Sequence, residues 1–254
     1  MKNIGKLLIA TIATVSLTGC VKDEMSPFFA RSFGETAEYL VENNIPDFSG
    51  VCVNEDGTGL YGVSNAGALY NISFEGENLG KLPFESNKDF EGVTVDTDNK
   101  VVYMCEETEW AIYKLNADKQ GVTKVIDIPV EGGVSNKGFE GIAYGKGNLY
   151  VGNQADPTII YTYNIAQNKV TGSMIVNHAG YISDLFYDAT DDTLWSVDAD
   201  KNLATHFTLD GKVLATYDAS FVTKPEGIFI DYPRGVIWFS CDGSGRMYSA
   251  KINF

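Results

Sequence analysis

The feature that most constrains this chain is a short motif that occurs five times. Each copy places a polar residue ahead of a short run of hydrophobic residues, and in four copies a glycine lies between them. The copies are Asp47–Val53, Asp89–Asp96, Gly138–Tyr144, Ile182–Asp188 and Pro225–Asp231. The aligned position (Gly50, Gly92, Gly141, Leu185, Gly227) recurs after 42, 49, 44 and 42 residues. Such a period is typical of one four-stranded propeller blade, so the repeats predict an all-β propeller.

The pattern inside each repeat supports the same architecture. A turn rich in Asp, Asn and Gly follows the first expected strand, and the second strand carries an aromatic residue near its start. These aromatic residues are Tyr61, Tyr103, Tyr150, Trp195 and Trp238. Hydrophobic alternation with turns every eight to twelve residues or so indicates β-structure throughout. The repeat count therefore predicts five blades of four strands.

The last repeat lacks one strand, since the chain ends at Phe254 after the third strand of that blade. An unpaired edge there would favour aggregation. The segment Ala37–Val41 has strand character and precedes the first repeat. We therefore expect an N-terminal strand to complete the last blade, and residues 28–254 to form a single propeller domain.

The first twenty residues differ from the rest and indicate a targeting signal. Lys2 and Lys6 precede the apolar run Leu7–Leu17, which is shorter than the roughly 20 residues of a membrane-spanning helix. The sequence Leu17-Thr18-Gly19-Cys20 resembles the lipobox of bacterial lipoproteins. We expect lipidation at Cys20, a tether over residues 21–27 and an outer-membrane location. Val21–Glu24 resembles the surface-export signal of Bacteroidetes lipoproteins; the alternative is a solvated linker.

Charge and composition narrow the possible partners. The formal net charge is −15, which argues against nucleic acid because phosphate binding needs a basic surface. The chain holds only two histidines, which disfavours a His-rich zinc site. We expect Cys52, Cys105 and Cys241 to be buried free thiols, with a Cys52–Cys241 bridge as the alternative. We also expect a monomer.

The repeat signature resembles the SdiA-regulated family of bacterial propellers. The resemblance covers nearly all of the chain after the signal and rests on Ser49-Gly50, Phe90-Glu91-Gly92, Phe139-Glu140-Gly141, Ser183-Asp184 and Pro225-Glu226-Gly227. That family is similar to calcium-dependent phosphotriesterase and gluconolactonase propellers, which hold calcium in the central tunnel. The resemblance thus implies a propeller with a metal site and no defined reaction. Relatives in this superfamily are usually six-bladed, so six blades are the alternative to five.

The residue before each aligned position suggests a ring of acidic groups. In a propeller the first strand of every blade lines the central channel, so equivalent positions form a ring at one height. The positions are Ser49, Glu91, Glu140, Asp184 and Glu226. Four carboxylates in a narrow tunnel repel one another unless protonated or bound to a cation. Oxygen ligands favour Ca²⁺ before Mg²⁺. The alternative is that each carboxylate hydrogen-bonds to the backbone of the neighbouring blade.

The ends of the second strands add candidate contacts on the same face. In a propeller the first strand starts, and the second strand ends, on one face of the disc. The candidate secondary metal or ligand contacts are Ser49 in the ring and three residues at these strand ends, Glu106, Asn153 and Asp198.

Three functions are compatible with these features. The first is a lipid-anchored extracytoplasmic propeller that binds a small molecule or a protein at an acidic, Ca²⁺-occupied tunnel face. The second is a Ca²⁺-dependent hydrolase of lactones or phosphoesters, in which the ion polarises a substrate oxygen. The third is a surface scaffold without a small-molecule site. The sequence identifies no catalytic residue and has few histidines, which are the side chains that most often transfer protons near pH 7, so the first function is favoured.

Overall fold

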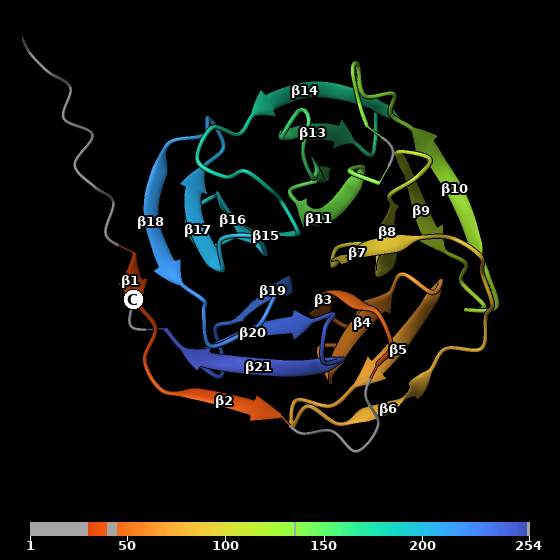
Figure 1. Ribbon diagram of the computed structural model, residues 1–254. Helices are drawn as coiled ribbons and strands as arrows, with labels where there is room; N and C mark the ends of the chain where they lie inside the picture. Colours follow the sequence, from red (N-terminus) through yellow and green to blue (C-terminus); the bar gives the residue numbers. More distant parts are fainter. Residues whose placement is uncertain (1–29, 40–44, 135, 253–254) are drawn as a thin grey trace, which may run out of the picture.

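A computed structural model describes residues 30–39, 45–134 and 136–252, and these are all strands, turns and loops. The strands form five sheets arranged in a ring (Figure 1). The first blade contains β3 (Phe48–Val53), β4 (Leu60–Ser64), β5 (Ala68–Ile72) and β6 (Asn78–Lys81). The second contains β7 (Phe90–Asp96), β8 (Val101–Glu106), β9 (Ala111–Leu115) and β10 (Val122–Asp127). The five-bladed propeller is therefore confirmed, and the six-bladed alternative is wrong.

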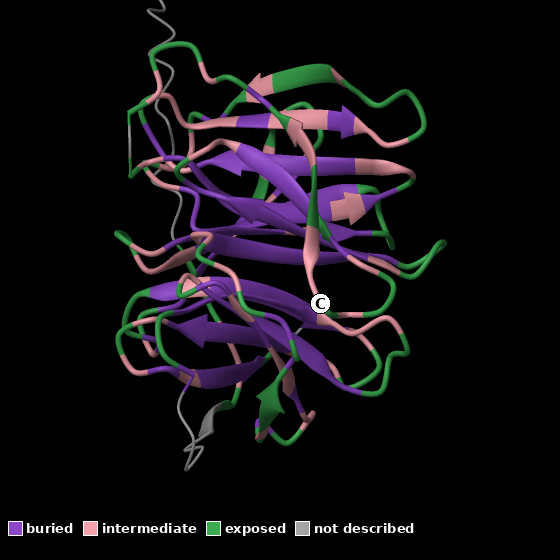
Figure 2. Ribbon diagram, turned by 90° about the vertical axis from the view of Figure 1, so that its right-hand side faces the viewer, coloured by how far each residue is buried: buried purple, intermediate pink, exposed green. Residues whose placement is uncertain are grey.

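The third and fourth blades repeat this meander. The third contains β11 (Phe139–Gly145), β12 (Asn148–Asn153), β13 (Ile159–Asn164) and β14 (Lys169–Ile175). The fourth contains β15 (Asp184–Asp188), β16 (Thr193–Asp198), β17 (Leu203–Thr208) and β18 (Val213–Asp218). The inner strands β7, β11 and β15 are buried at most positions, whereas the outer strands β10 and β14 are largely solvent-exposed (Figure 2).

The last blade is completed by the N-terminal part of the chain, as predicted. It contains β19 (Pro225–Asp231), β20 (Val236–Cys241) and β21 (Arg246–Lys251), and β2 (Thr36–Tyr39) pairs antiparallel with β21. The short strand β1 (Arg31–Ser32) adds in parallel to β18 of the fourth blade. The N-terminal segment therefore joins the outer edges of two neighbouring blades (Figure 1).

The hydrophobic core lies between the blades. Each core cluster combines residues of adjacent sheets. The largest fully buried side chains of the core include the second-strand residues Tyr61, Trp195 and Trp238. Cys52, Cys105 and Cys241 are buried free thiols, which confirms the sequence expectation and removes the bridge alternative. The described residues contain no helix that is long and apolar enough to cross a membrane.

Glycines set the width of the tunnel. A Cβ atom on Gly92 would lie 2.7 Å from the carbonyl oxygen of Glu140, and one on Gly227 would lie 2.7 Å from that of Ser49. Gly50 and Gly141 have equally close neighbours on the next inner strand. The inner strands thus touch backbone to backbone at one level, and we call this level, Gly50, Gly92, Gly141 and Gly227, the waist. Such contact explains why the repeat requires glycine here.

Candidate acidic metal centre

A β-bulge places the polar residue ahead of each waist glycine. The pairing of inner and second strands shifts by one residue between Phe90 and Gly92, between Phe139 and Gly141 and between Pro225 and Gly227. The first blade has the same shift between Phe48 and Val51. The extra residue is Glu91 in the second blade, Glu140 in the third and Glu226 in the fifth. In the first blade it is one of the pair Ser49-Gly50. A bulge re-aims its side chain, which is how the repeat presents these groups at the tunnel end.

The fourth blade differs in the residue that lies at the waist, and this changes the predicted ring. Asp184 pairs with Val197, two residues after Trp195, just as Gly141 pairs with Gly152, two residues after Tyr150. Asp184 therefore occupies the waist position of its blade, and Leu185 does not. Ser183 takes the ring position instead, because it hydrogen-bonds to Glu226 as Ser49 does to Glu91. The expectation that Asp184 lies at the height of the glutamates is wrong by one residue.

Asp184 forms a plug at the waist. Its side chain is fully buried, and its Oδ2 accepts a hydrogen bond from the backbone N–H of Ile228 in the next blade at 3.0 Å. Burial raises the pKa of this carboxyl, whereas the backbone amides of Ile228, Leu185, Ile142 and Val51 lower it. These amides come from four different blades. Asp184 thus makes the interblade contact that the clasp alternative described.

The ring glutamates have a different environment, which they share with two further acids. The acidic groups of Asp89, Glu91 and Glu107 each offer an oxygen, and these oxygens lie within 4.8 Å of one another. Glu140 interacts electrostatically with Glu91, Glu226, Glu107 and Asp89. We call Asp89, Glu91, Glu107, Glu140 and Glu226 the acidic mouth. Asp89 and Glu107 were missed as ligands because neither occupies the aligned ring position: Asp89 is the first residue of its motif copy, one residue before an inner strand, and Glu107 is one residue after a second strand.

Repulsion in the acidic mouth is strong because few cations lie near it. Burial, and then the charges of Asp89 and Glu107, raise the pKa of Glu91 to about 8. Burial and Asp89 raise the pKa of Glu107 to about 7. Burial and the charges of Glu91 and Glu226 raise that of Glu140. Glu140 Oε1 also accepts a hydrogen bond from Gln154 Nε2 at 2.6 Å, which brings no charge.

The two sides of the acidic mouth differ in whether a cationic side chain pairs with the carboxylates. Lys224 Nζ lies 3.2 Å from Glu226 Oε1 and 3.4 Å from Asp242 Oδ2, so the fifth-blade side has a cation. The second-blade side, with Asp89, Glu91 and Glu107, has none among the ion pairs of the described residues. The oxygen-only donor set and the burial of Glu91 and Glu107 fit a hard divalent cation. This side is the better candidate centre.

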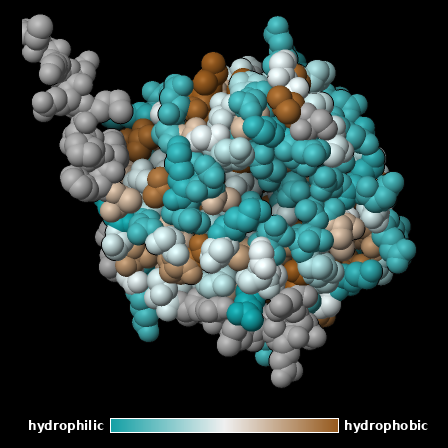
Figure 3. All heavy atoms as spheres, in the orientation of Figure 1, coloured by the Kyte–Doolittle hydropathy of each residue, from teal (hydrophilic) through white to brown (hydrophobic). Residues whose placement is uncertain are grey.

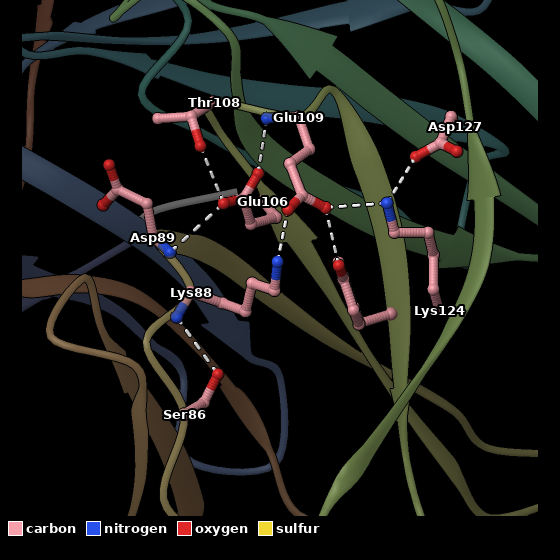
Figure 4. A network of polar contacts seen from close by, with 9 residues as sticks. Ser86, Lys88, Asp89, Glu106, Thr108, Glu109, Lys124 and Asp127 are labelled. Atoms are coloured by element: carbon pink, nitrogen blue, oxygen red, sulfur yellow. Dashed lines mark hydrogen bonds and ion pairs between the residues drawn. The ribbon is translucent and has the colours of Figure 1, made fainter.

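The predicted secondary contacts have structural roles. Glu106 is buried, and its carboxylate accepts hydrogen bonds from the backbone of Asp89 and Glu109 and from the Thr108 hydroxyl (Figure 4). The beginning of the loop after β8 is therefore held by Glu106, and the adjoining Glu109 pairs with Lys88 and Lys124. These contacts direct Glu106 away from the role of a ligand.

Asn153 and Asp198 repeat the role of Glu106 in the next two blades. Asn153 accepts from Trp110 Nε1 at 3.0 Å and donates to the carbonyl oxygens of Ala155 and Pro157. Asp198 accepts from the backbone of Gly180 and Lys201 at 3.1 and 3.0 Å. Of the predicted secondary contacts, only Ser49 touches a ring glutamate.

Comparisons with known proteins agree with this architecture. The model of the family described as SdiA-regulated matches residues 36–179. Glutaminyl cyclase from Myxococcus xanthus superposes with a TM-score of 0.66 at 15% identity, covering 86% of this chain and 94% of that one. A protein of unknown function from Bacteroides thetaiotaomicron gives a TM-score of 0.58 at 10% identity, covering 88% and 73%.

A third solved structure has a different named activity. Virginiamycin B lyase from Staphylococcus aureus superposes with a TM-score of 0.52 at 16% identity, covering 85% of this chain and 70% of that one. At these identities the three structures share the fold with this chain, and the two activities that are named, a cyclase and a lyase, differ from each other. The fold therefore leaves the chemistry of this chain to its own residues.

Proposed function

Because the chain belongs to the SdiA-regulated family, we propose that it is a binding propeller whose acidic mouth holds a divalent cation, Ca²⁺ in preference to Mg²⁺. A small molecule or a partner protein would then bind at this end of the tunnel, with the cation as a structural or bridging group. The observation that supports this most is the cluster of Asp89, Glu91 and Glu107, whose oxygens lie together and form no ion pair with a lysine or arginine of the described residues.

The residues have separate roles in this proposal. Glu91, Glu107 and Asp89 would supply oxygen ligands, and Glu140 would add a further carboxylate from the next blade. Ca²⁺ accepts six to eight oxygens in loose geometry, which suits groups that come from a strand, a loop and a neighbouring blade. Ser49 and Gln154 orient the carboxylates through hydrogen bonds.

We expect Ca²⁺ to stabilise the full chain and a chelator to destabilise it. A ligand that binds the folded state alone adds roughly 2.7 kcal/mol at a hundredfold excess over Kd. Combining Glu91→Gln with Glu140→Gln should remove the response, whereas Glu109→Gln should keep it because Glu109 lies outside the mouth and pairs with lysines. Calorimetric titration and melting curves with Ca²⁺, Mg²⁺ and chelator measure this. A wild-type melting curve that ignores both Ca²⁺ and chelator would contradict the proposal.

The same experiments separate binding from hydrolysis. Neither histidine contacts the acidic mouth, since the His178 ring packs against Phe207 and the His206 ring stacks on Trp195. We therefore expect a panel of lactones and phosphotriesters to show no turnover above that of the double variant. Turnover that needs Ca²⁺ and is lost in the double variant would instead establish the hydrolase.

We also propose that the protein is held at the outer membrane by a lipid on Cys20, which lies outside the described residues. The support is the sequence Leu17–Cys20 after a short apolar run. Cys20→Ala should move the protein from the membrane fraction to the soluble fraction, or leave its precursor unprocessed, as seen by fractionation and mass spectrometry. An unchanged mass and membrane fraction would disprove lipidation at this residue.

A further inference from the structure

The tunnel contains a cavity on the other side of the waist from the acidic mouth. Its volume is about 320 Å³, and all five inner strands contribute to its wall. These contributions follow the waist residues along each strand, as in Val51–Val53 of β3 and Leu185–Tyr187 of β15. Because the inner strands run away from the acidic mouth, this cavity opens toward the opposite face of the disc. Its size lies at the lower end of the ~300–1,000 Å³ typical of ligand pockets.

The wall of this cavity is apolar. Valine, leucine and isoleucine side chains from four blades meet there, with Ala143 and the aromatic residues Phe186 and Phe229. The two phenylalanine rings pack edge to face with centroids 5.7 Å apart. Phe186 is only half-buried, so its ring is accessible from the cavity. Rigid aromatic and aliphatic walls of this kind suit a ring system.

The polar groups of the cavity lie at its opening. Thr97, Asp98 and Lys146 are exposed there, and the Tyr144 hydroxyl donates to Asp98 Oδ2 at 2.5 Å. Lys146 is already paired, with its Nζ 2.7 Å from Asp192 Oδ2. The charged side chains among the lining residues are thus one acid and one base, both at the opening. A charged ligand in the interior would lose its hydration without gaining an ion pair, so an uncharged ligand is favoured.

The inner strands also supply hydrogen-bonding groups. Each is the edge strand of its blade, so backbone groups on its free side face the tunnel. Two of these amides have side-chain partners, since Tyr144 N donates to Thr94 Oγ1 and Ile228 N donates to Asp184 Oδ2. Backbone groups of this kind are normally satisfied by protein, water or ligand. A ligand with one hydroxyl or amide group therefore fits better than a pure hydrocarbon.

The two ends of the tunnel are chemically separate. The waist strands touch backbone to backbone, and the fully buried Asp184 side chain lies there among backbone amides of four blades. The waist therefore divides the acidic mouth from this apolar cavity, and binding at one end needs no group from the other.

From this arrangement we propose a second binding site: the apolar cavity takes an uncharged, ring-containing small molecule that carries a single hydrogen-bonding group. The ring lies against Phe186, Phe229 and the aliphatic walls. The polar group lies toward the opening near Thr97 and Asp98. This site is independent of the proposed cation and is accessible from the opposite face of the propeller.

Three probes with the same ring and different charge test this site. The full chain is titrated calorimetrically with 1-naphthol, with 1-naphthoate and with 1-naphthylmethylammonium, each with and without chelator. We expect 1-naphthol to bind at a single site, the two ions to bind at least about tenfold more weakly, and chelator to change none of the three affinities. Absence of 1-naphthol binding, or equal binding of an ion, would overturn the proposal.

Two matched valine variants locate the binding. Val53 is half-buried and lines the cavity, so Val53→Phe should fill part of it and weaken 1-naphthol binding at least about tenfold. Val236 is also half-buried and packs against the same core cluster without lining the cavity, so Val236→Phe should bind as the wild type does. Melting curves identify any variant that fails to fold, and in that case Phe186→Ala replaces Val53→Phe. Wild-type affinity in a folded cavity variant would place the binding elsewhere and reject the site.

Discussion

Deleting residues 21–45 should lower the melting temperature by about 10 °C or more, or cause aggregation. The deletion removes β2 from the edge of β21 and β1 from the edge of β18. It also removes Phe33, whose ring stacks on Tyr217 at 4.9 Å and packs edge-on against Phe221 and Phe239. The last blade would then have three strands and an open edge, which favours aggregation.

Two smaller changes separate ring closure from loss of chain length. Deleting residues 21–28 alone should leave the melting temperature unchanged because it spares both strands. Phe33→Ala should destabilise by about 2 kcal/mol, less than the ~3–5 kcal/mol of a fully buried phenylalanine because Phe33 is half-buried. Circular dichroism melts and light scattering report both effects. A 21–45 deletion as stable as the intact chain would show that the N-terminal strand does not close the propeller.

The fold could be predicted from the sequence because the same blade pattern occurs in it five times. Five copies of one blade put Tyr61, Tyr103, Tyr150, Trp195 and Trp238 in equivalent places on the second strands. An error in one copy leaves the others unaffected. Only the segment before the first repeat was left to supply the missing fourth strand of the last blade. The strand β2 lies in that segment and pairs with β21.

The candidate site was less predictable because it depends on aligning the fourth repeat with the others to within one residue. In four blades the residue at the waist is glycine, whereas the strand pairing of the fourth blade places Asp184 there. An alignment that matches one acidic residue with another puts Asp184 beside the glutamates, whereas the register puts it in the place of a waist glycine. Asp89 and Glu107 flank the strands at positions where the residue type changes between repeats, as in Gly138 at the place of Asp89, so periodicity did not single them out.

The side-chain partners of the strand ends were equally invisible to the sequence. Glu106, Asn153 and Asp198 share a repeat position, and the sequence predicted all three to be metal or ligand contacts. Their role in the structure is to hold the following loop, through backbone donors such as those of Glu109 and Lys201 that only folding brings into place. The polar face of the disc therefore contains both structural and candidate binding residues. The face seen in Figure 3 is largely hydrophilic, with hydrophobic residues scattered over it.

The metal-free protein should lose stability as the pH rises from about 5 to about 9. The folded-state pKa of Glu91 is raised to about 8, and those of Glu107 and Glu140 are also raised. Between the ordinary glutamate pKa and these values, the folded state binds more protons than the unfolded state. Stability is therefore fully present below the ordinary pKa and is lost as the pH rises through the folded pKa, by up to about 1.4 kcal/mol per pH unit for each proton.

At lower pH, a buried histidine changes stability in the opposite direction. Burial lowers the pKa of His178 to about 4, so its contribution is lost as the pH falls below its ordinary value of 6.5. The three glutamates outweigh the one histidine above the ordinary glutamate pKa, so the metal-free protein should be most stable at about pH 5. Urea unfolding in chelator at several pH values measures the profile directly.

Three further samples identify the acidic mouth as the origin of the alkaline loss. Glu91→Gln removes the most clearly perturbed carboxyl of the second-blade side and should flatten the profile above about pH 6. Glu109→Gln is the matched control, because its lysine partners lower the pKa of Glu109 to about 2, so that it titrates outside this range. Wild-type protein with saturating Ca²⁺ should also show a flattened profile, since a bound cation keeps the carboxylates ionised and replaces their mutual repulsion with attraction. An alkaline loss that persists in Glu91→Gln would place its origin outside the acidic mouth, and a loss that Ca²⁺ leaves unchanged would show that the cation does not bind there.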